Sequence, residues 1–182
     1  MFYIVIFIAI AIASYMVQAN LQRKFKRYSQ VAVSAGLTGR EVAEKMLRDH
    51  GITDVQVIST PGQLTDHYNP TTHTVNLSEG VYESCSVAAA AVAAHECGHA
   101  VQHQYAYAPL RLRSSLVPVV QVASRWTPWL LLGGILTLTI FPQILLAGII
   151  LFALTTLFSF VTLPVEIDAS RRAIAWLQGA GI

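Results

Sequence analysis

The feature that most constrains this chain is a run of 40 residues, from Trp126 to Val165, that contains no Asp, Glu, Lys or Arg. As one helix the run would be about 60 Å long, roughly twice the hydrocarbon thickness of a bilayer. The sequence "FPQ" lies at its midpoint, where a proline favours a turn. We therefore predict a transmembrane helical hairpin over residues 127–164, which returns the chain to the side from which it left.

A second uncharged segment covers residues 1–22, and the basic sequence "RKFKR" follows it directly. A cleaved secretory signal would carry its positive charges before the apolar run. The opposite order predicts a retained N-terminal transmembrane anchor. With the hairpin this makes about three transmembrane helices, in agreement with a chain that is 54% hydrophobic and 12% charged.

The basic residues stand at the ends of the apolar segments. Besides residues 23–27 they include Arg111, Arg113, Arg125, Arg171 and Arg172. Because Lys and Arg favour the cytoplasmic side of a span, we predict a multi-pass protein of the cell (inner) membrane, with the N-terminus outside and the basic flanks inside. Nucleic-acid binding is not expected, since that function gathers basic residues on one soluble face.

Residues 28–125 read as one cytoplasmic domain with both helices and strands. Thr38 and Glu41 form a capping box at the start of a helix over residues 37–51. Short strands are predicted at 54–59, 64–68 and 73–77, and the last of them could pair with an extended substrate. An alanine-rich helix follows over residues 86–107, capped by Ser84 or Ser86.

This helix contains the sequence "AVAAHECGHAVQH". His95 and His99 lie one turn apart, and Glu96 is next to them. The HExxH pattern supplies two zinc ligands and a general base for peptide hydrolysis. His103 lies about 12 Å along the axis from His95, too far to share the ion. Cys97 is turned about 200° from His95, so we expect it to pack as a free thiol behind the site.

The third ligand must come from another segment. Glu166 is the strongest candidate, because it follows the apolar run and Pro164, and a carboxylate leaving a bilayer needs a partner. The competing interpretation is an interfacial ion pair of Glu166 with Arg171 or Arg172. The other candidates are His50, His67, His73, Glu79, Glu83 and Asp168.

Two other functions compete with peptide hydrolysis. One is a non-proteolytic membrane scaffold that zinc stabilises, but a purely structural site has no need of Glu96. The other is a transport or adaptor protein whose histidines handle ions. Three predicted spans, two of them an uncharged hairpin, offer little to line such a pathway.

The sequences "HYNPTTHTVNLSEGVYESCSVAAAAVAAHECGHAVQH" and "TLPVEIDASRRA" resemble the YugP-like membrane zinc metallopeptidases of bacteria, from about Leu37 to Trp176. The resemblance implies a gluzincin-type, zincin-like α+β peptidase domain, with His95, His99 and Glu166 as ligands and Glu96 as the catalytic residue. HtpX-like and CAAX prenyl peptidases are more distantly similar. They place an aspartate four residues after the ligand glutamate, where this chain has Ser170, and Asp168 should face elsewhere.

Peptidases of this kind usually continue past the position where this chain ends, at "WLQGAGI". The prediction for the chain is a mainly α-helical membrane zinc metalloendopeptidase. Residues 165–182 are predicted to form a helix that carries Glu166. The predicted cofactor is Zn²⁺. The predicted partners are the lipid bilayer and a membrane-associated peptide or protein substrate. The active site is expected on the cytoplasmic side.

Overall fold

A computed structural model of the chain describes residues 2–182, so Met1 of the predicted anchor lies outside the described residues. Helices account for most of these residues, and three short strands form a small sheet. The predicted mainly helical fold with a small sheet is therefore confirmed.

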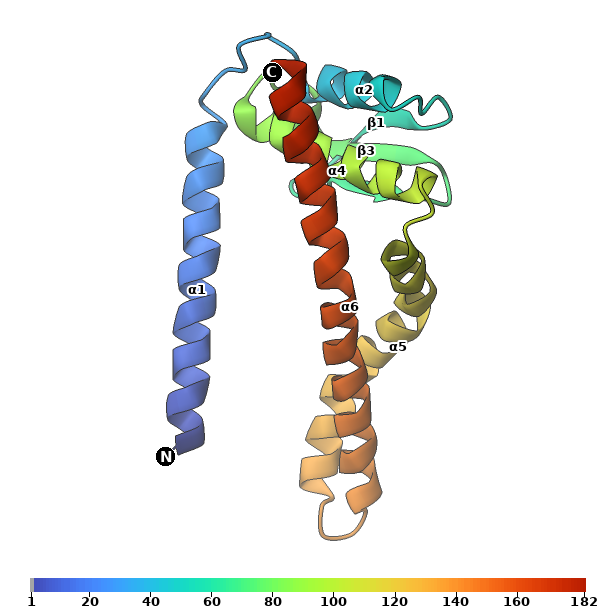
Figure 1. Cartoon of the computed structure of the whole chain (residues 1–182). Coiled ribbons are helices and arrows are strands. Elements are labelled where there is room, and N and C mark those ends of the chain that lie inside the picture. Colours follow the sequence, from blue (N-terminus) through green and yellow to red (C-terminus); the bar gives the residue numbers. More distant parts are fainter. Residues whose placement is uncertain (1) are drawn as a thin grey trace. The chain divides into compact units, whose positions relative to one another are not determined.

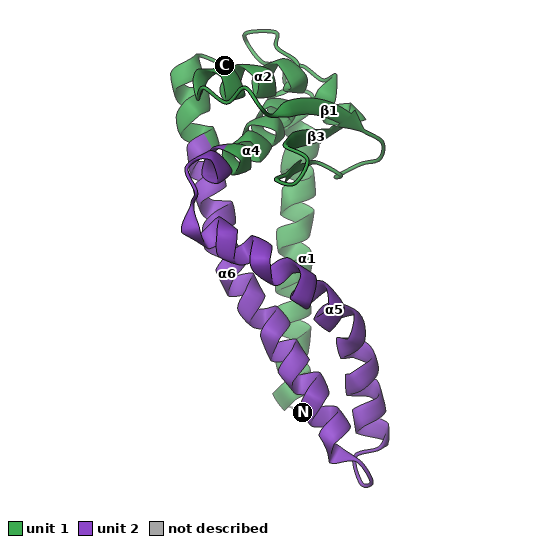
Figure 2. Cartoon of the chain, turned by 90° about the vertical axis from the view of Figure 1, so that its right-hand side faces the viewer, with its two compact units in different colours: residues 1–100, 173–182 green, residues 101–172 purple. Residues whose placement is uncertain are grey.

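The chain forms two compact units, which Figure 2 shows in different colours. One consists of residues 1–100 and 173–182, and the other of residues 101–172. Both boundaries fall inside helices, namely α4 (Val87–Gln104) and α6 (Pro142–Ala180). Each of these two helices is therefore continuous from one unit into the other.

The first helix, α1 (Phe2–Tyr28), has no buried residue among those described. Its apolar side chains cover all sides of the helix, and Lys26 and Arg27 occupy its last turn. A helix that is apolar on all sides is typical of a buried core helix or of a membrane span. Among the described residues, α1 and α6 are the two helices that are long and apolar enough to cross a membrane.

The sheet contains β1 (Gln56–Thr60), β2 (His67–Asn69) and β3 (Thr74–Ser78), in the order β1-β3-β2. Strand β3 pairs in parallel with β1 and antiparallel with β2. The prediction that this third strand binds an extended substrate is wrong, because both of its edges are already paired. The strands with an edge for a further partner are β1 and β2.

Helix α2 (Gly39–Asp49) begins with the predicted capping box. The Glu41 amide donates to Thr38 Oγ1 at 3.2 Å, and the Thr38 amide donates to Glu41 Oε2 at 2.8 Å. The helix starts next to the short α3 (Glu79–Tyr82), where a Cβ on Gly39 would overlap the Val81 carbonyl. The core of this unit contains apolar side chains of α2 and β3, namely Val42, Met46, Leu47, Val75 and Leu77.

In the second unit, α5 (Ala108–Leu136) and α6 form a hairpin joined by a short loop (Figure 1). The loop occupies residues 137–141, close to the predicted turn. Glycines allow the two helices to approach closely: a Cβ on Gly134 would overlap the backbone of Leu145, and one on Gly148 would press against Leu131. A membrane crossing by α5 stays a prediction.

Helix α6 runs through Pro164, so the predicted separate helix over residues 165–182 is instead the last part of α6. A proline inside a helix removes one backbone donor and disturbs the preceding turn, but the helix can continue where its other residues are well packed. Val165 and Ala169, which follow Pro164 on one face, are both fully buried. Glu166 therefore lies inside a long helix.

Candidate metal centre

Helix α4 carries the HExxH sequence. Ser86 precedes it, and the Ala89 amide donates to Ser86 Oγ at 3.2 Å. Small side chains along one face are buried, among them Ala93, Ala94 and Cys97. The helix ends at Gln104, shortly before Ala106 adopts a left-handed conformation with φ 49°. Because the side chains on this face are small, α4 can lie close to its neighbours in the core.

Cys97 packs behind the candidate site, as predicted. Its side chain is fully buried, and its Sγ lies 3.6 Å from the Ala43 carbonyl oxygen of α2. Burial raises the pKa of the Cys97 thiol. Cys85 is exposed, and both cysteines are free thiols. Cys97 is therefore a packing residue that joins α4 to α2.

His95 and His99 share one face of α4. Their ring centroids lie 4.9 Å apart, with an angle of 82° between the ring planes. His99 is buried and His95 is half-buried. The two imidazoles therefore present nitrogen atoms to the same small volume, as residues one turn apart should.

Glu96 is buried next to the histidines and contacts the edge strand β2. The Tyr68 amide donates to Glu96 Oε2 at 3.0 Å. Burial raises the pKa of Glu96, whereas His99, His95 and the Tyr68 amide act in the opposite direction. Tyr68 is opposite Val75 of β3, but its amide points to α4. This amide fixes one oxygen of the carboxylate.

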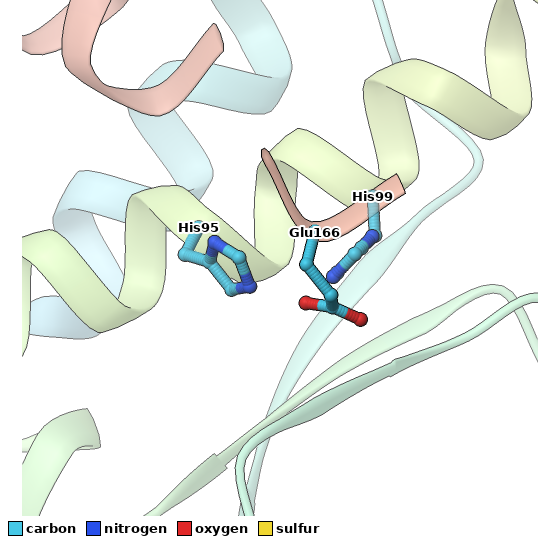
Figure 3. A group of neighbouring side chains, drawn as sticks. All are labelled: His95, His99 and Glu166. Atoms are coloured by element: carbon cyan, nitrogen blue, oxygen red, sulfur yellow. The ribbon is translucent and has the colours of Figure 1, made fainter. Parts of the chain in front are cut away.

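The carboxylate of Glu166 completes a three-residue group. One ligand atom from each of His95, His99 and Glu166 lies within 4.8 Å of the other two. Figure 3 shows the two imidazoles and the carboxylate directed toward one another. Two imidazoles and one carboxylate form the ligand set of many catalytic zinc sites. The donor chemistry of these residues therefore fits a zinc ion.

Arg113 of α5 also contacts this carboxylate. Its Nη2 lies 3.5 Å from Glu166 Oε1, and both side chains are about one third exposed. By its position in the sequence, Arg113 belongs to a basic flank of an apolar segment, and Arg171 or Arg172 is the expected rival partner of Glu166. The observed pair shows that α5 supplies a cation to the same group.

The other candidates for the third ligand make different contacts. His50 Nδ1 lies 2.8 Å from the Met46 carbonyl oxygen, and His73 Nδ1 lies 2.8 Å from Asp54 Oδ2. Asp168 accepts hydrogen bonds from Gln102 and Arg172. Among residues 2–182, the three-residue group of possible metal ligands contains neither these residues nor His103.

The sequence did not predict the contacts of three residues near this site, Tyr68, Arg113 and Gln102. The Tyr68 contact is a backbone amide, which any residue except proline could supply. Arg113 and Gln102 contact α6 across more than 50 intervening residues. No spacing rule within one helix or strand predicts such pairs.

Comparison with known proteins agrees with this chemistry. The family model described as "Putative neutral zinc metallopeptidase" matches residues 3–182. The chain is 44% identical over 173 residues to "Putative membrane protease YugP" of Bacillus subtilis (strain 168), which covers 95% of this chain and 76% of that protein. None of the solved structures matches the chain. With an HExxH helix, a converging glutamate and a family match over nearly its whole length, the chain belongs to this neutral zinc metallopeptidase family.

Proposed function

We propose that the chain is a membrane-bound zinc endopeptidase that cleaves peptide bonds at the cytoplasmic face of a bacterial membrane. The observation that carries this proposal is the convergence of His95, His99 and Glu166 beside Glu96. In this assignment the two imidazoles and the Glu166 carboxylate hold zinc. The family and the name of the Bacillus relative support the reaction class and the membrane location.

Glu96 is assigned the proton transfers. When bound, zinc would supply Lewis-acid activation of a water molecule and of the scissile carbonyl. Glu96 would accept a proton from the attacking water and donate it to the leaving amine. Its burial favours this role, because a carboxylate with a raised pKa holds a proton more readily at neutral pH. The Tyr68 amide keeps the carboxylate oriented during both transfers.

The edge of β2 is the proposed place for an extended substrate. Tyr68 belongs to this edge strand, and its outward amide already reaches Glu96. A peptide pairing along β2 would leave the Tyr68 amide to Glu96 and would run past the group that moves the proton. Main-chain pairing of this kind recognises many sequences, because it uses backbone groups that every peptide has.

The membrane location is proposed from α1 and α6, together with the basic residues that follow their apolar segments, at 23–27 in α1 and at 171–172 in α6. Both helices are long and apolar enough to span a bilayer. The positively charged flanks favour the cytoplasmic side. Substrates held in or near the membrane would reach such a site most easily.

The test uses the full chain, purified in detergent and loaded with zinc. Glu96→Gln removes the proton carrier and keeps the shape of the side chain. We expect cleavage of an unfolded protein to fall about 10²–10⁴-fold, while bound zinc is retained. Glu83→Gln, the same substitution at an exposed residue, should cleave like wild type. Equal cleavage by wild type and Glu96→Gln would reject the peptidase and favour a zinc-stabilised scaffold.

A further inference from the structure

Gln102 is a completely buried amide on α4, three residues after His99. A buried amide is costly unless its polar atoms are hydrogen-bonded. Gln102 Nε2 donates to the Val165 carbonyl oxygen at 2.8 Å and to Asp168 Oδ2 at 2.8 Å. Both acceptors belong to α6, so a single side chain of the HExxH helix holds α6 at two points.

These two points lie on either side of Glu166 in the sequence. Val165 immediately precedes it, and Asp168 follows two residues later. Pro164 stands just before this segment and cannot donate a backbone hydrogen bond, which is the usual cause of bending in a helix. The Gln102 contacts therefore restrain α6 in the turn that directly follows this break in its hydrogen bonding.

Asp168 is itself held in place by Arg172. Arg172 Nε donates to Asp168 Oδ2 at 2.6 Å, and the guanidinium carbon lies 6.0 Å from the centre of the Tyr107 ring. A hydrogen bond to an ionised carboxylate is stronger than one between neutral groups. Gln102 thus donates to an acceptor whose position is already fixed.

We propose that Gln102 is a positioning residue for the third metal ligand. By fixing Val165 and Asp168, it sets the rotation of α6 about its axis and hence the direction in which Glu166 is presented. His99 and Gln102 are neighbours on the same rigid helix, so one turn of α4 carries both a ligand and the residue that aligns the next ligand. This inference rests on the proposed zinc site.

The substitution Gln102→Met tests the proposal, because methionine has a similar length and no donor. The matched control is Gln104→Met, at an exposed position of the same helix. We expect Gln102→Met to lose about 10–100-fold in zinc affinity, the usual effect of removing a residue that orients a ligand. Zinc affinity is measured by competition with a chromophoric chelator, and circular dichroism checks that each variant is folded.

Cobalt substitution supplies a second readout. The visible absorption bands of Co²⁺ report ligand geometry, so Gln102→Met should shift them while Gln104→Met should not. Gln102→Asn keeps the donor but shortens its reach, and should give an intermediate zinc affinity. Wild-type zinc affinity and an unchanged cobalt spectrum in folded Gln102→Met would overturn the proposal. Asp168→Ala removes one of the two Gln102 contacts from the α6 side, and should also weaken zinc affinity; it is the variant to use if Gln102→Met does not fold.

Failure of this inference can be separated from failure of the proposed site. If His99→Ala and Glu166→Ala abolish zinc binding but Gln102→Met does not weaken it, the site stands and Gln102 has only a packing role. If neither His99→Ala nor Glu166→Ala changes zinc binding, the metal site itself is wrong, and the inference about Gln102 falls with it.

Discussion

The neighbours of Glu96 have opposing effects on its pKa. Its burial favours the neutral acid, while His95, His99 and the Tyr68 amide favour the anion. The net effect is a raised pKa, and a raised pKa favours a group that must hold and then release a proton. The nearby Cys97 experiences no such opposition, since burial and the charge of Glu96 both raise the pKa of its thiol and keep it protonated and unreactive.

Glu166 provides the sharpest test of the metal assignment at a single residue. Glu166→Gln keeps the size of the side chain but removes the negative charge that zinc requires from a carboxylate ligand. We expect zinc affinity to fall by more than the roughly 10–100-fold typical of residues outside the ligand set. Equilibrium dialysis against buffered zinc measures this directly. Glu79→Gln, at an exposed residue of α3, should bind zinc like wild type.

Among the elements, α2 has the best-defined start. Thr38→Ala removes the hydroxyl that accepts from the Glu41 amide and should lower the free energy of unfolding by about 1 kcal/mol. Chemical denaturation monitored by circular dichroism gives the value. Thr71→Ala, at an exposed loop residue, is the control and should have a much smaller effect.

The effect of Thr38→Ala should also depend on pH. The backbone amide and hydroxyl of Thr38 lower the pKa of Glu41 in the folded chain. The stabilisation by this pair is therefore present above the unfolded pKa, about 4.3, and is lost as the pH falls through the folded pKa. The difference between wild type and Thr38→Ala should shrink at acidic pH. A difference that stays constant between neutral and acidic pH would show that the Thr38 hydroxyl does not stabilise the Glu41 carboxylate.

The hairpin of α5 and α6 depends on close approach at Gly134. Gly134→Val should destabilise the hairpin by about 1–3 kcal/mol, because the new side chain overlaps the backbone of Leu145. The adjacent Gly133 faces open space, so Gly133→Val changes helix propensity equally without the overlap. Thermal unfolding in detergent compares the two variants. Equal stability of both would mean that the helices do not pack through Gly134.

For the whole molecule, local patterns in the sequence predict the elements better than their contacts. The four-residue spacing of His95 and His99 identifies their shared face, because that geometry is contained within one helix. Glu166 could be proposed only from its position after an apolar run and from the resemblance of its segment to the YugP-like peptidases. The central position of β3, the course of α6 through Pro164 and the contacts of Gln102 and Arg113 depend on residues far apart in the chain, which no local pattern encodes.

The sequence likewise predicts the membrane-spanning helices better than it predicts their orientation in the membrane. Helices α1 and α6 have the length and composition of spans, but the side on which each end lies is predicted from charge alone. All the basic flanks favour the cytoplasm. Since α5 and α6 form a hairpin, a crossing by both would place the loop of residues 137–141 outside and return Glu166 to the side of His95.

Single cysteines test this topology in intact cells, in a Cys85→Ser background where the buried Cys97 is protected. A membrane-impermeant maleimide should label Thr139→Cys, in the exposed hairpin loop, and should not label Ser34→Cys, in the exposed segment after α1. After permeabilisation both should react, which controls for accessibility. Labelling of Ser34→Cys in intact cells would move the HExxH domain to the outer face. No labelling of Thr139→Cys before permeabilisation would show that the hairpin does not cross the bilayer.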